Sequence, residues 1–118
     1  MEREMTVVDL AELAASGGSG AIFARETADL DLNLVRFAPG SGVGEHVNRE
    51  VDVAVIVLDG EGVLTVDGAE HPLRAGRATI IPKGVRRAIR ATGDVPLVYV
   101  TVHRRRRRLW PSTPDRQA

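Results

Sequence analysis

Short alternations of hydrophobic and polar residues run along most of this chain and predict β-strands. The clearest lies in Asp29–Phe37, where three leucines alternate with Asp29, Asp31 and Asn33, the period-two pattern of a half-buried strand. Similar apolar runs predict strands at Ala21–Glu26, Val53–Leu58, Val63–Val66, His71–Leu73, Ala78–Ile81, Val85–Arg90 and Leu97–Val102. The last run is apolar on both faces, so we expect it in the centre of a sheet.

Turn residues separate these strands at short intervals. Asp67-Gly68 is a type I′ hairpin signal, because both turn positions need a positive φ. Clusters of Gly, Pro and Asp mark other turns at Ala38–Gly42, Asp59–Gly62, Arg74–Gly76, Pro82–Gly84 and Thr92–Asp94. About eight short strands with little helix predict an all-β fold, either an antiparallel sandwich or a small barrel.

The N-terminal segment has a different pattern. Thr6–Ala15 has apolar residues near helical spacing and predicts a short amphipathic helix, although a peripheral strand followed by a turn fits the same residues. Ser16–Gly20 is then a flexible connector. We expect three parts: residues 1–20 as N-terminal segment and connector, 21–103 as the β-barrel, and 104–118 as an arginine-rich C-terminal tail.

The composition narrows the class of protein. At 118 residues the chain is expected to form one domain. It has no cysteine, which excludes disulfides, thiolate catalysis and cysteine-ligated metals. No apolar run approaches the roughly 18 residues of a membrane-spanning helix, and the N-terminus lacks the pattern of a signal peptide. We therefore expect a cytoplasmic protein with no membrane partner.

The net charge is zero, but the charges are unevenly distributed. Residues 1–72 hold 14 acidic and 4 basic side chains, whereas residues 73–118 hold 2 acidic and 12 basic ones. The run His103–Arg108, which contains Arg104–Arg108, would suit a nucleic acid. The chain offers few aromatic side chains for base stacking, so we expect no nucleic-acid partner. The arginines would instead balance the acidic half within the fold or across a dimer.

Polar residues that can bind a metal or take part in catalysis lie immediately before the apolar strand Val53–Leu58. They are His46, Asn48, Glu50 and Asp52, which would share one face of an unbroken strand. His46 with Glu50 and Asp52 would supply an imidazole and two carboxylates, a donor set that suits a divalent metal. A hydrogen-bonded structural role for His46 fits the same pattern.

The run VLDGEGVLTVDGAEHPLRAG, followed by IIPKGV, resembles the cupins over about residues 30–102. This resemblance implies a single-domain jelly-roll β-barrel that forms a homodimer. In metal-binding cupins, three His and one Glu hold a divalent metal inside the barrel. The first of these histidines matches His46, but the second falls on Asn48, the Glu on Asp52 or Val53, and the third His on Arg87. The resemblance therefore implies a cupin barrel with a degenerate metal site.

We favour no cofactor on these grounds. The alternative is a divalent metal (Fe, Mn, Ni or Zn) in a rearranged site, held by His46 with Glu50 or Asp52. The other two histidines give weaker signals. We expect His71 at the surface after its hairpin turn, and a structural role for His103 at the end of the last strand, although its face could approach a barrel mouth.

Arg87 is the most informative departure from the cupin motif. It shares one face of Val85–Arg90 with Val85 and Ile89, and we expect this face to point inward. A buried guanidinium is costly unless it is paired, so we expect Asp52, Glu50 or a bound anion beside it. A structural ion pair and an anion-binding site are equally compatible with this pattern.

Three functions remain open. The first is small-molecule binding, with an anionic or carbonyl-bearing ligand in a pocket lined by His46, Asn48, Glu50, Asp52, Val53, Val55, Val57, Val85, Arg87 and Ile89. The second is an enzyme. His46 would act as general acid and base beside Arg87 in isomerase or lyase chemistry, or a rearranged metal site would support a dioxygenase or isomerase. The third is an interaction module that works through the arginine-rich tail.

Overall fold

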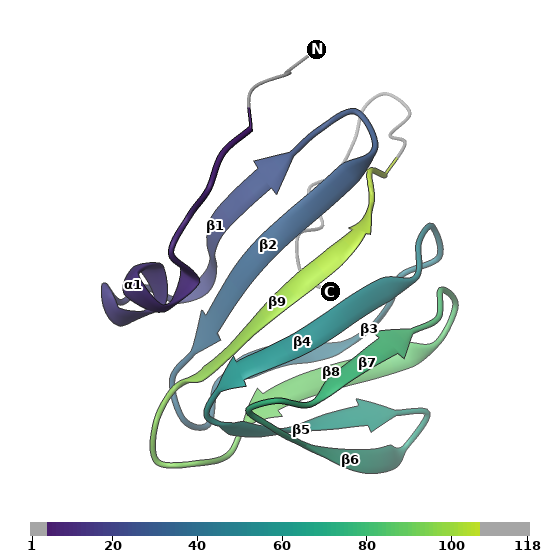
Figure 1. The fold of residues 1–118 in the computed structure, drawn as a ribbon. Helices are drawn as coiled ribbons and strands as arrows, with labels where there is room; N and C mark the ends of the chain where they lie inside the picture. Colours follow the sequence, from purple (N-terminus) through teal and green to yellow (C-terminus); the bar gives the residue numbers. More distant parts are fainter. Residues whose placement is uncertain (1–4, 107–118) are drawn as a thin grey trace.

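The computed structural model describes residues 5–106, in which two antiparallel sheets face each other as a jelly-roll sandwich (Figure 1). The five-stranded sheet has the order β1-β2-β9-β4-β7, and the four-stranded sheet has the order β3-β8-β5-β6. The elements are α1 Leu10–Ala15, β1 Gly20–Glu26, β2 Leu30–Phe37, β3 Gly42–Val47, β4 Val53–Asp59, β5 Glu61–Val66, β6 Ala69–Arg74, β7 Ala78–Ile81, β8 Arg86–Ala91 and β9 Leu97–Arg104. The predicted all-β class is confirmed.

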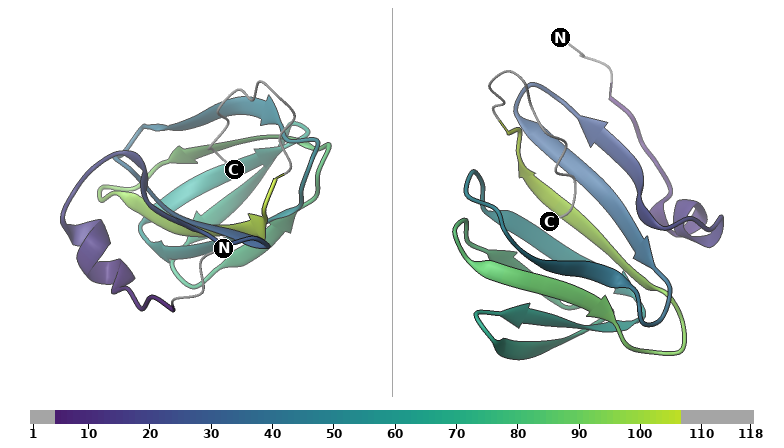
Figure 2. Two further views of the ribbon diagram at one scale, coloured as in Figure 1. Left: turned by 90° about the horizontal axis from the view of Figure 1, so that it is seen from above. Right: turned by 180° about the vertical axis from the view of Figure 1, so that it is seen from behind.

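The hydrophobic core takes its residues from both sheets, which face each other in the views from above and behind (Figure 2). Alternate residues of β4 point into this core, so Val53, Val55 and Val57 are at most 1% exposed. Leu64 of β5 and Ile89 of β8 meet them from the facing sheet. Strand β9 lies in the middle of the five-stranded sheet, as its two apolar faces predicted.

The alternation in β2 is confirmed, but both of its faces are covered. Leu34 packs with Val98 and Val100 in a second cluster, outside the sandwich, against which α1 and β1 pack. The opposite face contributes Val35 and Phe37 to the core between the sheets. Because alternate residues share a face, Asp31 and Asn33 point to the interior as well. The polar face of this strand is therefore the inner one.

Turn chemistry was predicted well. Asp67 (φ 47°) and Gly68 (φ 86°) both have positive φ and close the β5–β6 hairpin, which confirms the type I′ signal. Gly60 (φ 78°) joins β4 to β5 where the backbone approaches the β8–β9 connection, so that a Cβ would lie 2.2 Å from the carbonyl oxygen of Pro96. Only glycine fits there without distortion.

Two stretches differ from what their sequence patterns suggest. The helix occupies Leu10–Ala15 rather than Thr6–Ala15, because Asp9 caps its N-terminus by accepting a hydrogen bond from the Glu12 backbone N–H at 3.0 Å. The polar run 46–52 does not form one unbroken strand: β3 ends at Val47, and the connection to β4 bends at Glu50. Consequently the face-sharing expected for His46, Asn48, Glu50 and Asp52 is not realised.

One end of the sandwich gathers the polar residues. There β3 and β9 end while β2, β4 and β8 begin, at the upper right of Figure 1. We call it the polar end; it contains Asp31 and His103 from the five-stranded sheet and His46 and Arg87 from the four-stranded sheet. Within residues 5–106 no helix is long and apolar enough to cross a membrane.

Candidate functional site

The candidate site is built around Arg87, whose side chain is fully buried at the polar end. Arg87 lies directly opposite His46 in the β3–β8 register, beyond an irregularity between Val43 and His46. Its Nε donates a hydrogen bond to His46 Nε2 at 3.2 Å, and its Nη1 lies 3.5 Å from the Val85 carbonyl oxygen. The prediction that Arg87 points inward is confirmed.

The two contacts of His46 fix its tautomer. A guanidinium can only donate, so His46 Nε2 must present its lone pair to Arg87. The Gly44 carbonyl oxygen can only accept, so His46 Nδ1, 2.9 Å away, carries the hydrogen. His46 is thus a neutral imidazole held between backbone and guanidinium, in a half-buried position.

The other polar residues of the predicted cluster hold the loop that follows β3. The buried Asn48 Oδ1 accepts hydrogen bonds from the backbone N–H groups of Glu50 (2.9 Å) and Val51 (3.2 Å). Asp52 Oδ1 accepts one from the backbone N–H of Lys83 at 2.9 Å. Glu50 is exposed, and its carbonyl oxygen accepts from Arg104 at 3.0 Å. These contacts give Asn48 and Asp52 structural roles.

The apolar residues of the predicted pocket lie where inward alternation puts them. Val53, Val55, Val57 and Ile89 are core residues, and Val85 is partly buried against the same core. Their role in ligand binding stays a prediction.

The described residues do not fit a divalent metal at the cupin position. His46 already directs its Nε2 lone pair at a cationic group, and that cation occupies the place of a third histidine ligand. Asn48 and Asp52 direct oxygens at backbone N–H groups. No group of three or more His, Asp or Glu side chains in residues 5–106 is arranged to hold a metal.

A second polar cluster lies on the five-stranded sheet, which faces Arg87, and its importance was underestimated from the sequence. His103 of β9 is buried, with Nε2 3.8 Å from Asp31 Oδ2 and Nδ1 2.7 Å from the Arg104 carbonyl oxygen. Asn33 Nδ2 donates to Asp31 Oδ1 at 3.3 Å. The sequence signal for this cluster was the alternation along the last strand, because His103 lies on the same face as the core residue Tyr99.

Two hydroxyl groups point into the same interior. Tyr99 and Thr101 are buried on the inner face of β9, and within residues 5–106 neither Tyr99 Oη nor Thr101 Oγ1 has a hydrogen-bond partner. Burial raises the pKa of the Tyr99 phenol above its ordinary value. A buried hydroxyl without a hydrogen-bond partner lowers the stability of the fold by about 1–3 kcal/mol. A water molecule or a ligand group beside each of the two hydroxyls would remove this cost.

The arginine run is only partly within the described residues. Arg104 bonds to the backbone of Glu50, and Arg105 Nη2 lies 3.5 Å from Glu26 Oε1. The Arg105–Glu26 contact joins the basic and acidic halves within the fold, as expected. Residues 107–118 lie outside the described part of the chain, and so does most of the predicted tail. His71 is exposed, as predicted.

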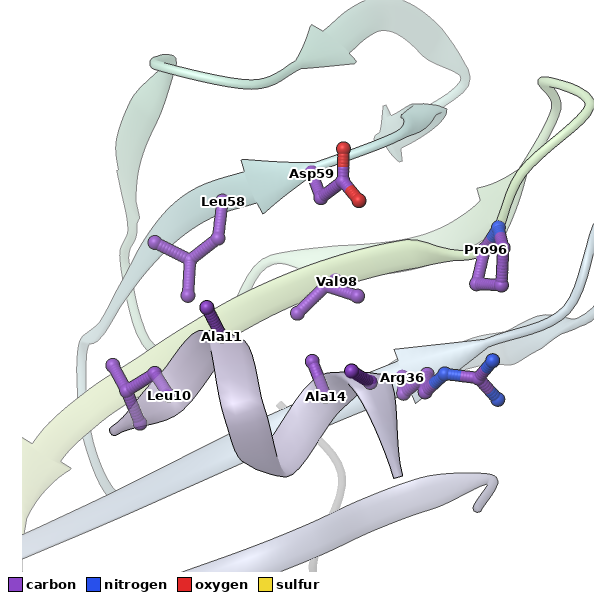
Figure 3. Close-up of a pocket in the computed structure, with 9 residues that line it drawn as sticks. Leu10, Ala11, Ala14, Arg36, Leu58, Asp59, Pro96 and Val98 are labelled. Carbon is purple, nitrogen blue, oxygen red and sulfur yellow. The ribbon is translucent and has the colours of Figure 1, made fainter. Parts of the chain in front are cut away.

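A groove of about 530 Å³ lies outside the sandwich, between α1 and the outer face of the five-stranded sheet (Figure 3). Its walls are mainly apolar and include Leu10, Ala14, Leu58 and Val98. Arg36 also lines the groove, but its Nη1 donates to the Gly18 carbonyl oxygen at 2.9 Å. The groove is separate from the polar end.

The fold and the motif positions define the class of protein. The model of the cupin domain family matches residues 33–103, more than half of the chain, and the chain belongs to this family. The jelly-roll sandwich is therefore a small cupin domain.

Individual relatives show how varied this family is. Protein SchB of Streptomyces halstedii is 40% identical over 57 residues, which cover 48% of this chain and 41% of SchB. Dimethylsulfoniopropionate lyase DddW of Ruegeria pomeroyi is 35% identical over 54 residues, 46% of this chain and 35% of DddW. The matches thus span less than half the length of these relatives. The structure of a predicted oxalate decarboxylase from Thermotoga maritima superposes with a TM-score of 0.59 at 29% identity, covering 62% of this chain and 64% of that one.

Proposed function

We propose that this cupin domain binds a small molecule bearing a carboxylate or carbonyl group, and that the ligand lies at Arg87 and His46. The observation that carries the proposal is the fully buried Arg87 guanidinium, oriented by His46 at the position of a metal ligand in metal-binding cupins. A guanidinium presents a planar set of donors that matches a carboxylate. In this proposal the positive charge of the binding site comes from the Arg87 side chain and not from a metal ion.

Two further observations support this proposal. The hydroxyls of Tyr99 and Thr101 lack partners among the described residues and offer hydrogen bonds to a polar ligand. Two relatives are named for carboxylate compounds, oxalate and dimethylsulfoniopropionate. An apolar interior with few convergent polar groups is the usual composition of a small-molecule site.

The test is calorimetric titration of tag-free protein with acetate, propionate, pyruvate, oxalate and succinate. We expect saturable binding of at least one of them, weakened at least tenfold in Arg87→Met. The matched control is Arg86→Met, because Arg86 is the next residue and lies on the exposed face. Equal affinities in the three proteins, or no binding to any of these compounds, would overturn the proposal.

The alternative function is acid–base catalysis at His46, favoured by the lyase name of DddW. His46 Nε2 faces the site but accepts a hydrogen bond from Arg87, so the guanidinium must shift before this nitrogen can receive a substrate proton. Incubating each bound carboxylate with the protein and following it by proton NMR distinguishes the two functions. Turnover that disappears in His46→Gln supports the enzyme, and an unchanged ligand supports the binding protein.

We also propose that the domain is a cytoplasmic homodimer that packs through the outer face of its five-stranded sheet. Ile56 and Leu58 of β4 are each 40% exposed on this face, and Ile80 of β7 is 68% exposed. Light scattering during gel filtration should give a dimer mass for the wild type and for Val95→Asp, a control at an exposed loop residue. Ile80→Asp should give a monomer. A wild-type monomer would exclude the dimer.

A further inference from the structure

We propose that Asp31 and His103 form a second binding element inside the barrel, which receives a hydroxyl group of the ligand. This inference rests on the proposed function, in which the carboxylate of the ligand lies at Arg87. The ligand class is then a small hydroxycarboxylate, held by its carboxylate from one sheet and by its hydroxyl from the other.

The geometry of His103 leaves it without a direct hydrogen bond to Asp31. The Arg104 carbonyl oxygen, 2.7 Å away, can only accept, so His103 Nδ1 carries a hydrogen and its Nε2 is directed at Asp31 Oδ2. The 3.8 Å between these two atoms is well beyond the roughly 2.7–3.2 Å that is usual for an N–H···O hydrogen bond. Neither protonation state of His103 therefore forms a direct bond to Asp31.

A hydroxyl oxygen placed beside this pair would bridge the two atoms. At about 2.8 Å from each, it donates its hydrogen to the Asp31 carboxylate and accepts one from Nε2 when the imidazole is doubly protonated. The other carboxylate oxygen of Asp31 accepts from Asn33 Nδ2 at 3.3 Å. The side chains of His103 and Asp31 are only 4% and 16% exposed, so solvent has little access to the position between them.

Thr101 gives an independent indication of a bound group here. It precedes His103 by two residues on the same inner face of β9 and pairs with Asn33 across β2. Its side chain is 1% exposed, and its Oγ1 has no hydrogen-bond partner within residues 5–106. A ligand hydroxyl near Asp31 and His103 would come within reach of this unpartnered group.

The two binding elements lie at the same end of the barrel on facing sheets. Arg87 is at the start of β8, whereas His103 is near the end of β9 and Asp31 at the start of β2. Facing sheets pack about 10 Å apart, and side chains from both sides occupy part of that distance. A ligand of only a few carbon atoms can therefore contact both elements.

The experiment compares hydroxy acids with their deoxy partners, using lactate against propionate and malate against succinate. Calorimetry on the wild type should show at least tenfold tighter binding of the hydroxy acid in at least one pair. Asp31→Asn and His103→Gln should remove this preference while still binding the deoxy acid, which reports an intact barrel and Arg87. Asp29→Asn is the matched control, because Asp29 is exposed and carries the same charge.

The outcomes separate this inference from the proposed function. Equal binding of hydroxy and deoxy acids by the wild type would overturn the inference and leave carboxylate binding at Arg87 standing. No binding of any acid would overturn both. Should the variants fail to fold, ¹⁵N NMR of the wild type decides: the hydroxy acid should shift the His103 Nε2 resonance and the deoxy acid should not. Identical shifts with both acids would refute the inference.

Discussion

Arg87 Nε donates a hydrogen bond to His46 Nε2 at 3.2 Å, and Arg87 is fully buried. The next residue, Arg86, forms the exposed counterpart on the same two strands: its Nη1 lies 3.5 Å from Glu45 Oε1, and the two side chains are 57% and 54% exposed. The two pairs join the same strands in different environments. Burial, rather than charge alone, should therefore determine which pair matters for stability.

A double-mutant cycle tests this expectation. Arg87→Met and His46→Ala should show a coupling free energy of about 1–2 kcal/mol in urea unfolding, because Arg87 is fully buried and its partner His46 is half-buried. The cycle with Arg86→Met and Glu45→Ala should give about 0–0.5 kcal/mol, since exposed ion pairs are screened. Equal coupling free energies in the two cycles would show that the Arg87–His46 contact stabilises the fold no more than the exposed Arg86–Glu45 pair does.

Asn48 should matter through the loop that it holds. Asn48→Ala removes the acceptor of the Glu50 and Val51 backbone N–H groups, and Val51 is 1% exposed. We expect a loss of about 1–3 kcal/mol in the free energy of unfolding, the cost of leaving the buried Val51 N–H without its partner. Asn48→Asp keeps the acceptor oxygen and should lose less. An Ala variant as stable as the Asp variant would contradict this role.

Tyr99 should give the domain a stability that declines in alkali. Burial raises the pKa of its phenol in the folded state above the value of about 10 for an unfolded chain. The neutral phenol therefore favours folding fully below about pH 10, and this contribution falls as the unfolded chain begins to lose the proton above that pH.

The chain has one tyrosine, so tyrosinate absorbance near 295 nm reports this group alone. We expect this absorbance to appear together with the loss of β-sheet circular dichroism as pH rises. Tyr99→Phe, which removes an unpartnered buried hydroxyl, should unfold at higher pH. Ionisation of Tyr99 in a protein that is still folded would contradict the prediction.

Local sequence signals predicted most of the fold, because eight of the nine strands in the described residues agree with their own patterns; β3, Gly42–Val47, was not predicted. The alternation in β2 and β8 and the Asp67-Gly68 turn all specify structure within a few residues, and they were realised. The inward position of Arg87 followed from the same alternation. These signals need no knowledge of distant contacts.

The partners across the barrel could not be predicted in the same way. His46 meets Arg87 through a strand pairing that spans 41 residues, and Asp31 meets His103 through the β2–β9 pairing. Alternation also does not say which face of a strand is inner when both are covered, so the polar face of β2 was not recognised as the inner one. The loop at Asn48, too, was hidden by an alternation that continued past the end of β3.

The most direct test of the central claim is elemental analysis of purified, tag-free protein after incubation with Fe, Mn, Ni and Zn salts, alongside His46→Ala. If Arg87 supplies the cation of this site, metal content should be far below one ion per chain and the same in both proteins. Near one metal ion per chain in the wild type, lost in His46→Ala, would contradict the account and show that His46 is a metal ligand.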